Sequence, residues 1–187
     1  MITLRVLDLD VLDCAAEVIF LPIDGGTVPA AAGAALIDRS LGRIARAFAR
    51  RYPDAELVEE IEAQVTFPLP LGRAAAVELP AGGRFRTALL LSTLAHQPER
   101  TGEQALLAAM SGAFGEALHI CASLAATSAA TPVLTGGWRL PAATVITAML
   151  QAVAAARGGA FTLSICVLDD PAASAQARDL ARSLGFG

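Results

Sequence analysis

The sequence predicts an α/β fold, a three-layer α/β/α sandwich around a mixed central sheet of about six strands. In the second half of the chain, short apolar runs alternate with longer helical patterns. These runs are apolar at consecutive positions, which is typical of strands that are buried on both faces. A sheet that is buried on both faces requires helices on both sides.

Length and composition are those of one folded domain. The chain has 187 residues, of which 55% are hydrophobic and 17% charged, so we expect residues 1–187 to form a single domain. No run of about 18 apolar residues is free of a charge, glycine or proline, which predicts no transmembrane helix and no membrane partner. The first ten residues lack the pattern of a signal peptide. We therefore expect a cytoplasmic protein.

Charge and cysteine usage exclude further classes. The net charge is −4, and the basic residues are all arginines that form no long run. This argues against nonspecific nucleic-acid binding, which requires phosphates to be neutralised. The cysteines Cys14, Cys121 and Cys166 are widely spaced and form no CxxC motif, so we expect them to be reduced core residues. The sequence predicts no metal site and no cofactor.

Apolar patterns and breakers set the elements of the first half. Pro22 is expected to end the second strand, because it has no backbone N–H. The segment Glu56–Ala63 is too polar and too short to assign. The predicted elements are strands over Ile2–Leu9 and Glu17–Pro22, a loop over Ile23–Pro29, and helical patterns over Ala30–Leu41 and Arg43–Arg51.

The second half repeats strand and helix more regularly. Asp170 followed by Pro171 is typical of a helix start, with a capping carboxylate and a proline in the first turn. The predicted strands are Ala74–Leu79, Thr87–Leu94, Thr131–Leu134 and Phe161–Leu168, and the predicted helices are Gln104–Ala126, Ala142–Arg157 and one from Pro171 to near Gly185.

The segment Thr131–Pro141 is the most informative stretch. A strand is followed by Gly136 and Gly137, then by Trp138, the only tryptophan of the chain, and then by a helix. Glycines allow close approach of a ligand to the backbone, and a helix N-terminus favours an anion. One interpretation is a phosphate site with a flat ring stacked on Trp138. The other is a tight strand-to-helix turn with Trp138 packed in the core.

Taken together, these pieces resemble a macro domain, the fold family best known for binding ADP-ribose. The match over Thr135–Pro141 to the second phosphate loop of the family has no gap and is the most specific. The segments that carry the resemblance are Asp10-Val11 with Glu17–Phe20, Gly33–Arg39, Leu89–His96 and Thr135–Pro141.

The resemblance implies a nucleotide site. In the family, the acid at the position of Asp10 contacts adenine, and the aromatic at the position of Trp138 shields the distal ribose. The diphosphate loop falls on Thr135, Gly136 and Gly137, with Arg139 in the same loop. A carboxylate that bonds an exocyclic amine and backbone donors that bond phosphate are physically sensible roles. The implied partner is a small nucleotide ligand resembling ADP-ribose.

Two positions depart from the family pattern. An asparagine that the family uses for ribose binding and hydrolysis falls on Asp24, which accepts hydrogen bonds but does not donate like an amide. Asp24 is therefore the candidate catalytic residue and ribose contact. The glycine run of the first phosphate loop falls on Pro29–Ala32, and Gly25 and Gly26 replace it only if the loop shifts by several residues.

Three functions compete at this point. We favour a binding module for ADP-ribose or a related nucleotide. The alternative is a degenerate relative that acts by self-association, as does the similar N-terminal domain of leucine aminopeptidases, and this alternative implies a homo-oligomer. An ADP-ribosyl hydrolase is the least favoured hypothesis, because the chain contains no asparagine.

Overall fold

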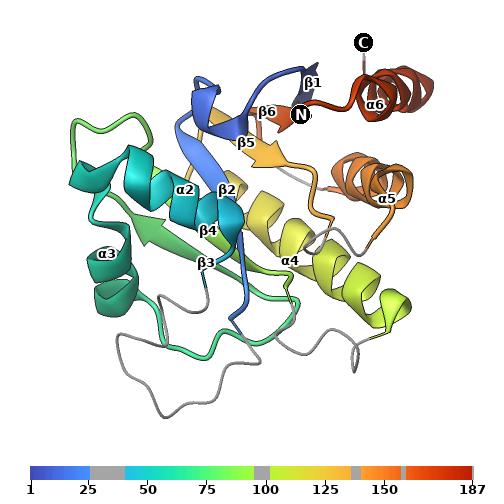
Figure 1. Cartoon of the computed structure of the whole chain (residues 1–187). Coiled ribbons are helices and arrows are strands. Elements are labelled where there is room, and N and C mark those ends of the chain that lie inside the picture. The colour runs from blue at the N-terminus through green and yellow to red at the C-terminus, as the bar shows by residue number, and fades with distance from the viewer. Residues whose placement is uncertain (26–40, 95–101, 136–139, 157–158, 187) are drawn as a thin grey trace.

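The computed structural model describes residues 1–25, 41–94, 102–135, 140–156 and 159–186. Within these residues one six-stranded sheet has the order β1-β6-β5-β2-β4-β3 (Figure 1). Neighbouring strands are parallel except β3 and β4, which are antiparallel. The predicted mixed sheet is therefore confirmed. The strands are β1 (Thr3–Leu7), β2 (Val18–Ile23), β3 (Ala74–Glu78), β4 (Thr87–Ser92), β5 (Ser128–Pro132) and β6 (Thr162–Cys166).

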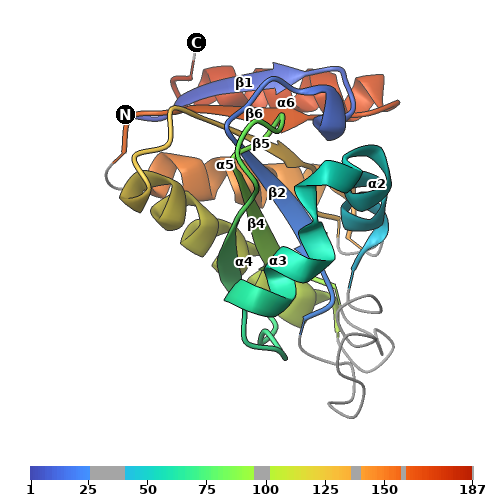
Figure 2. The ribbon, with the colours of Figure 1, turned by 90° about the vertical axis from the view of Figure 1, so that its left-hand side faces the viewer.

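Helices cover both faces of the sheet (Figures 1 and 2). One face carries α4 (Glu103–Ser123), α5 (Ala142–Ala155) and α6 (Pro171–Ser183), and the other carries α2 (Arg43–Arg51), α3 (Leu57–Gln64) and the short 3-10 turns η1 (Val11–Asp13) and η2 (Pro53–Ala55). Strand side chains alternate between the two cores. Phe20 packs with the α4 side, whereas Ile19 and Leu21 pack with the α2 side. The three-layer sandwich follows from this alternation.

The helix α4 forms the centre of one layer. Its buried residues recur at helical spacing, from Leu106 through Met110, Phe114 and Ala117 to Cys121. Among the described helices, α4 alone is long and apolar enough by composition to cross a membrane, a property that core helices of soluble proteins share. Burial, with a smaller effect of Glu17, raises the pKa of the Cys121 thiol to about 12. All three cysteines are free and buried, as predicted.

Several boundaries differ from the sequence prediction. The strand β2 continues through Pro22 to Ile23, and Ile23 C=O accepts a hydrogen bond from Thr93 N–H on the β4 side. The backbone of Pro22 faces the other side, where β5 no longer pairs, so the missing N–H of the proline breaks no hydrogen bond to β5. The unassigned polar segment forms helix α3, anchored by buried Leu57 and Ile61. β5 begins at Ser128 rather than at the predicted Thr131, since the small residues there carry no strand pattern. The predicted helix over residues 30–41 lies almost wholly outside the described residues.

Glu17 forms hydrogen bonds that connect the starts of β2, β4 and β5 at the amino edge of the sheet. Its Oε2 accepts hydrogen bonds from Thr127 N–H at 2.8 Å and from Thr127 Oγ1 at 3.1 Å. Its Oε1 accepts a hydrogen bond from Arg86 at 2.8 Å, and its backbone N–H donates to Ser128 Oγ at 3.0 Å. The hydrogen bond from Thr127 N–H is the main cause that holds the pKa of Glu17 below its ordinary value of 4.5.

We predict that Glu17→Gln lowers the free energy of unfolding near pH 7 by about 1–2 kcal/mol. A depressed pKa in the folded state stabilises the protein above the unfolded value, and this contribution is lost as pH falls through the folded pKa. The variant should therefore show a shallower loss of stability below pH 4.5. Urea denaturation across this range measures both effects. Glu62→Gln, at an exposed position of α3, is the control, and equal stability of the two variants near neutral pH would refute the role of Glu17.

Candidate functional site

Five parallel strands end at one edge of the sheet, which we call the carboxyl edge. In open α/β sheets, ligands bind at this edge where the connections of neighbouring strands depart to opposite faces. The chain leaves β2 toward α2 on one face and leaves β5 toward α5 on the other. Because α4 follows β4 on the same face as α5, both boundaries of β2 meet this condition, and of the two we consider the boundary with β5, where the strands do not stay paired to the edge.

The strands β2 and β5 separate as they approach the carboxyl edge. Their register contains two pairs, Val18 with Ala129 and Ile19 with Ala130. Beyond these pairs, β2 follows β4 to Ile23, and β5 follows β6 to Pro132. On the β2 side, Leu41 forms an isolated antiparallel bridge with Ile23 and brings in the start of α2.

The N-termini of α2 and α5 at this edge have no side-chain cap. Gly42 and Pro141 are their N-cap residues, and neither helix has an acid in its first turn. By contrast, Asp170 caps α6 by accepting from Ala173 N–H at 2.9 Å, and α4 has Glu103 in its first turn. Among the described α-helices, α2 and α5 are thus the ones with neither a side-chain cap nor an acid in the first turn, and the positive ends of their dipoles favour an anion.

The two ends of the loop that carries Gly136 and Gly137, which we call the glycine loop, are fixed directly before α5. Leu134 and Leu140 are both buried in the core. Leu140 N–H donates a hydrogen bond to Thr135 C=O at 3.0 Å, which joins the two ends of the loop. The loop residues Gly136, Gly137, Trp138 and Arg139 lie outside the described residues. Thr135 itself lies half-buried at the carboxyl edge, as its place after β5 requires.

Asp10 follows β1 at the same edge. It is the N-cap of η1, and its Oδ1 accepts from Leu12 N–H at 2.9 Å. The neighbouring acids are engaged elsewhere, since Asp13 pairs with Arg51 and Asp8 with Arg178. Hydrogen bonds from Ser174 and then from the same arginine lower the pKa of Asp8. Asp10 therefore has a structural role as a cap, and its place after β1 leaves it at the carboxyl edge.

Asp24 and Gly25 follow β2. Asp24 is the one buried charged residue in the described part of the chain, with 8% of its surface exposed. Gly25 packs tightly: a Cβ atom there would lie 2.8 Å from both Cβ and O of Leu69, and 3.3 Å from Oγ of Ser92. Gly25 is thus required for close packing, a role that its turn pattern did not reveal. Gly26 lies outside the described residues.

One exposed apolar residue at this edge was not identified from the sequence, because its pattern is that of a buried strand. Leu168 was predicted within the last strand, but β6 ends at Cys166 and Leu168 is 56% exposed. The next residue, Asp169, has a positive φ of 55°, so the chain turns sharply here. The signal in the sequence is the apolar residue directly before Asp169-Asp170. Leu168 adds an exposed apolar side chain to the carboxyl edge.

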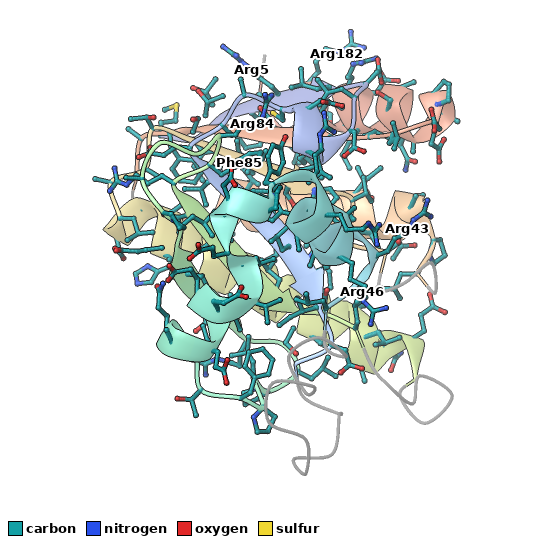
Figure 3. The ribbon with its side chains drawn as sticks, turned by 60° about the vertical axis from the view of Figure 1, so that its left-hand side comes forward. Arg5, Arg43, Arg46, Arg84, Phe85 and Arg182 are labelled. Atoms are coloured by element: carbon teal, nitrogen blue, oxygen red, sulfur yellow. The ribbon has the colours of Figure 1, made fainter. Side chains whose placement is uncertain are left out.

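A hollow of about 480 Å³ lies at the opposite edge, between the end of α2 and the β3–β4 turn. Figure 3 shows Arg84 and Phe85 in this turn, and Arg43 and Arg46 on α2. The hollow contains none of the residues predicted for the site. Its lining is Phe48, Arg51, Tyr52, Pro53, Asp54, Ala55, Leu79, Pro80, Ala81, Gly82, Gly83, Arg84 and Phe85.

Comparisons with known proteins identify the fold. No family model matches the chain, and no curated protein matches its sequence. In structure, the chain is similar to a mutant of the Oceanobacillus iheyensis macrodomain, with a TM-score of 0.69, 15% identity, and coverage of 97% of this chain and 92% of that one. The macro domain of ganglioside-induced differentiation-associated protein 2 gives a TM-score of 0.65 at 10% identity, with 99% and 86% covered.

Two further similar structures define the extent of the match. The macrodomain of Thermus aquaticus DarG gives a TM-score of 0.60 at 16% identity, with 89% of this chain and 99% of that one covered. The alphavirus P23pro-zbd gives a TM-score of 0.66 at 14% identity and 97% coverage of this chain, which spans only 24% of the viral chain. The chain therefore has the macrodomain fold, as the resemblance in sequence predicted. The resemblance to the aminopeptidase domain stays a hypothesis.

We predict that Gly25→Ala destabilises the protein by about 1–3 kcal/mol, because the added methyl group meets the Leu69 backbone. Gly115→Ala is the matched control, since a Cβ atom at this exposed position of α4 meets nothing within 4 Å. The control should gain about 0.5–1 kcal/mol from its higher helix propensity. Thermal unfolding of both variants tests the difference, and an unchanged melting temperature for Gly25→Ala would show that the turn is not tightly packed.

Proposed function

We propose that residues 1–187 form a module that binds ADP-ribose or a related nucleotide at the carboxyl edge. The observation that carries the proposal is the pair of uncapped helix N-termini, those of α2 and α5, on either side of the boundary where β2 and β5 separate. Such helix ends attract a diphosphate through free N–H groups and the helix dipole. Two helix ends match a ligand that carries two linked phosphates.

Each candidate residue has a role in this proposal. Thr135, Gly136 and Gly137 supply backbone donors to the diphosphate, with Trp138 against the distal ribose and Arg139 beside it. Asp10 accepts a hydrogen bond from the adenine amine through the carboxylate oxygen that does not cap η1. Asp24 accepts from a ribose hydroxyl, and the Gly25-Gly26 turn lies next to it.

Neighbouring structures support this class of ligand. The Oceanobacillus iheyensis macrodomain has been solved with ADP, at a TM-score of 0.63 and 12% identity to this chain. A mutant of it has been solved with ADPR, at a TM-score of 0.59 and 14% identity. Binding rather than hydrolysis is proposed here, because Asp24 replaces an amide donor by an acceptor. If ADP-ribosyl hydrolysis occurs, Asp24 is the residue proposed to activate water.

We predict saturable micromolar binding of ADP-ribose, measured by calorimetry and by the fluorescence of Trp138. Trp138→Ala should remove the optical signal and weaken the calorimetric affinity, because the ribose loses an apolar face. Gly136→Val should abolish binding, because a side chain blocks approach to the backbone donors. If neither a heat of binding nor a change in fluorescence is measured up to millimolar ligand, the proposal is wrong.

A second prediction separates the two roles of Asp10. Asn is as good an N-cap as Asp, so Asp10→Asn should leave the melting temperature unchanged. It should nevertheless weaken ADP-ribose binding about tenfold, since a hydrogen bond to a charged acceptor is replaced by one to a neutral amide. Inosine diphosphate ribose has a carbonyl oxygen in place of the exocyclic amine, so it should bind the variant at least as well as the unchanged protein, because an asparagine amide can donate to this oxygen and a carboxylate cannot. Equal loss of affinity for both ligands would place Asp10 outside the adenine site.

A further inference from the structure

The two edge strands of the sheet differ in how their outward backbone groups are satisfied. β1 pairs only with β6, and β3 pairs only with β4, so each presents one unpaired side (Figure 1). Unpaired N–H and C=O groups on an edge strand are a template for a further strand. Proteins commonly block such edges with side chains or charges.

Side chains block β3 at both ends. Its outward-facing residues are Ala74, Ala76 and Glu78, because the alternate residues bond to β4. Ala74 N–H donates to the Glu116 carboxylate at 2.7 Å. The Gln64 side chain forms the two hydrogen bonds to Glu78 that a neighbouring strand would form. Its Oε1 accepts from Glu78 N–H at 2.8 Å, and its Nε2 donates to Glu78 C=O at 2.9 Å. Another strand would have to displace these bonds.

The edge of β1 is open in the described part of the chain. Thr3 N–H donates to Phe161 C=O at 2.9 Å, so Thr3 faces β6 and the alternate residues Leu4 and Val6 face away. Among the described residues, no hydrogen bond is formed by the backbone groups of Leu4 and Val6 on this outer side. Their side chains are only half-buried against the α6 layer.

We propose that β1 pairs with β1 of a second copy of this chain, antiparallel and centred on Leu4. A two-fold axis at Leu4 places it opposite Leu4 of the partner subunit as a hydrogen-bonded pair. The same register places Ile2 opposite Val6 of the partner subunit. These side chains lie on the α6 face of the sheet, so apolar residues meet apolar residues across the interface.

The other face of the same register is also self-complementary. Met1, whose surface is 99% exposed, lies opposite Leu7 of the partner subunit. Thr3 lies opposite Arg5 of the partner subunit, so no two like charges face each other directly. Arg5 projects from the outer strand in Figure 3. The alternative register centred on Arg5 would place the two arginines directly opposite each other, which is why we commit to the axis at Leu4.

The asymmetry of the edges makes the assembly a closed dimer. Each chain has one open edge, so pairing of the two β1 strands uses both open edges and leaves only the blocked β3 edges outside. A two-fold contact of this kind does not grow into a fibre. The pairing is independent of nucleotide binding and makes no use of the uncapped helix ends.

The test is sedimentation equilibrium of the full chain over a range of concentrations, together with four variants. The unchanged protein should dimerise. Leu4→Pro removes an N–H group that points away from β6, and should give a folded monomer. Ala76→Pro removes the corresponding outward group of the blocked β3 edge, and should dimerise like the unchanged protein. Circular dichroism and melting establish that each variant is folded.

Two charge variants test the register without altering the backbone. Thr3→Arg places like charges opposite each other twice per dimer and should weaken dimerisation about tenfold, whereas Thr3→Asp creates two ion pairs with Arg5 and should strengthen it by a similar factor. A protein that is monomeric up to about millimolar concentration would overturn the proposal. A dimer that is unaffected by Leu4→Pro or shows the same response to both charges at Thr3 would also overturn it.

Discussion

The separation of β2 from β5 is the constraint on which the candidate site depends. After the Ile19–Ala130 pair, the two strands follow different neighbours, and the start of α2 enters beside Ile23. The connections after β2 and β5 lead to helices on opposite faces, and both helices follow strands that end at the carboxyl edge. Pro22 is compatible with a strand here only because β5 no longer pairs with it. One break in the hydrogen-bond ladder thus accommodates the proline and admits the start of α2 beside Ile23.

Elements with a strongly apolar pattern could be predicted from the sequence. Elements that form only by packing against or pairing with neighbouring strands could not. The runs of β4 and β6 are mostly apolar, so their patterns were sufficient to place both strands, although the pattern of β6 also included the exposed Leu168. Helix α3 could not be assigned, because Leu57 and Ile61 gain their helical role only by packing against the sheet. β5 was placed three residues late, because Ser128 and its small neighbours form a strand only when they have strands on both sides.

The candidate site could be predicted in part. Asp10, Asp24 and Thr135 were separate positions in the sequence, and the parallel sheet brings the strands that precede them to one edge. Their roles as local caps and packing residues were less visible. The Asx cap of η1 by Asp10 and the tight packing of Gly25 depend on neighbours that sequence spacing does not specify. The edge asymmetry is a further case, since Gln64 and Glu116 reach β3 only in the folded chain.

Hydrogen–deuterium exchange with and without ADP-ribose tests the central claim most directly. The account predicts that ligand slows exchange in two separate segments, the start of α5 after Thr135 and the start of α2 after Leu41, because both helix ends donate N–H groups to the diphosphate. Amides of the β3–β4 turn at the opposite edge should be unaffected. Slowed exchange at that turn, or at neither helix end while ligand is bound, would contradict the account.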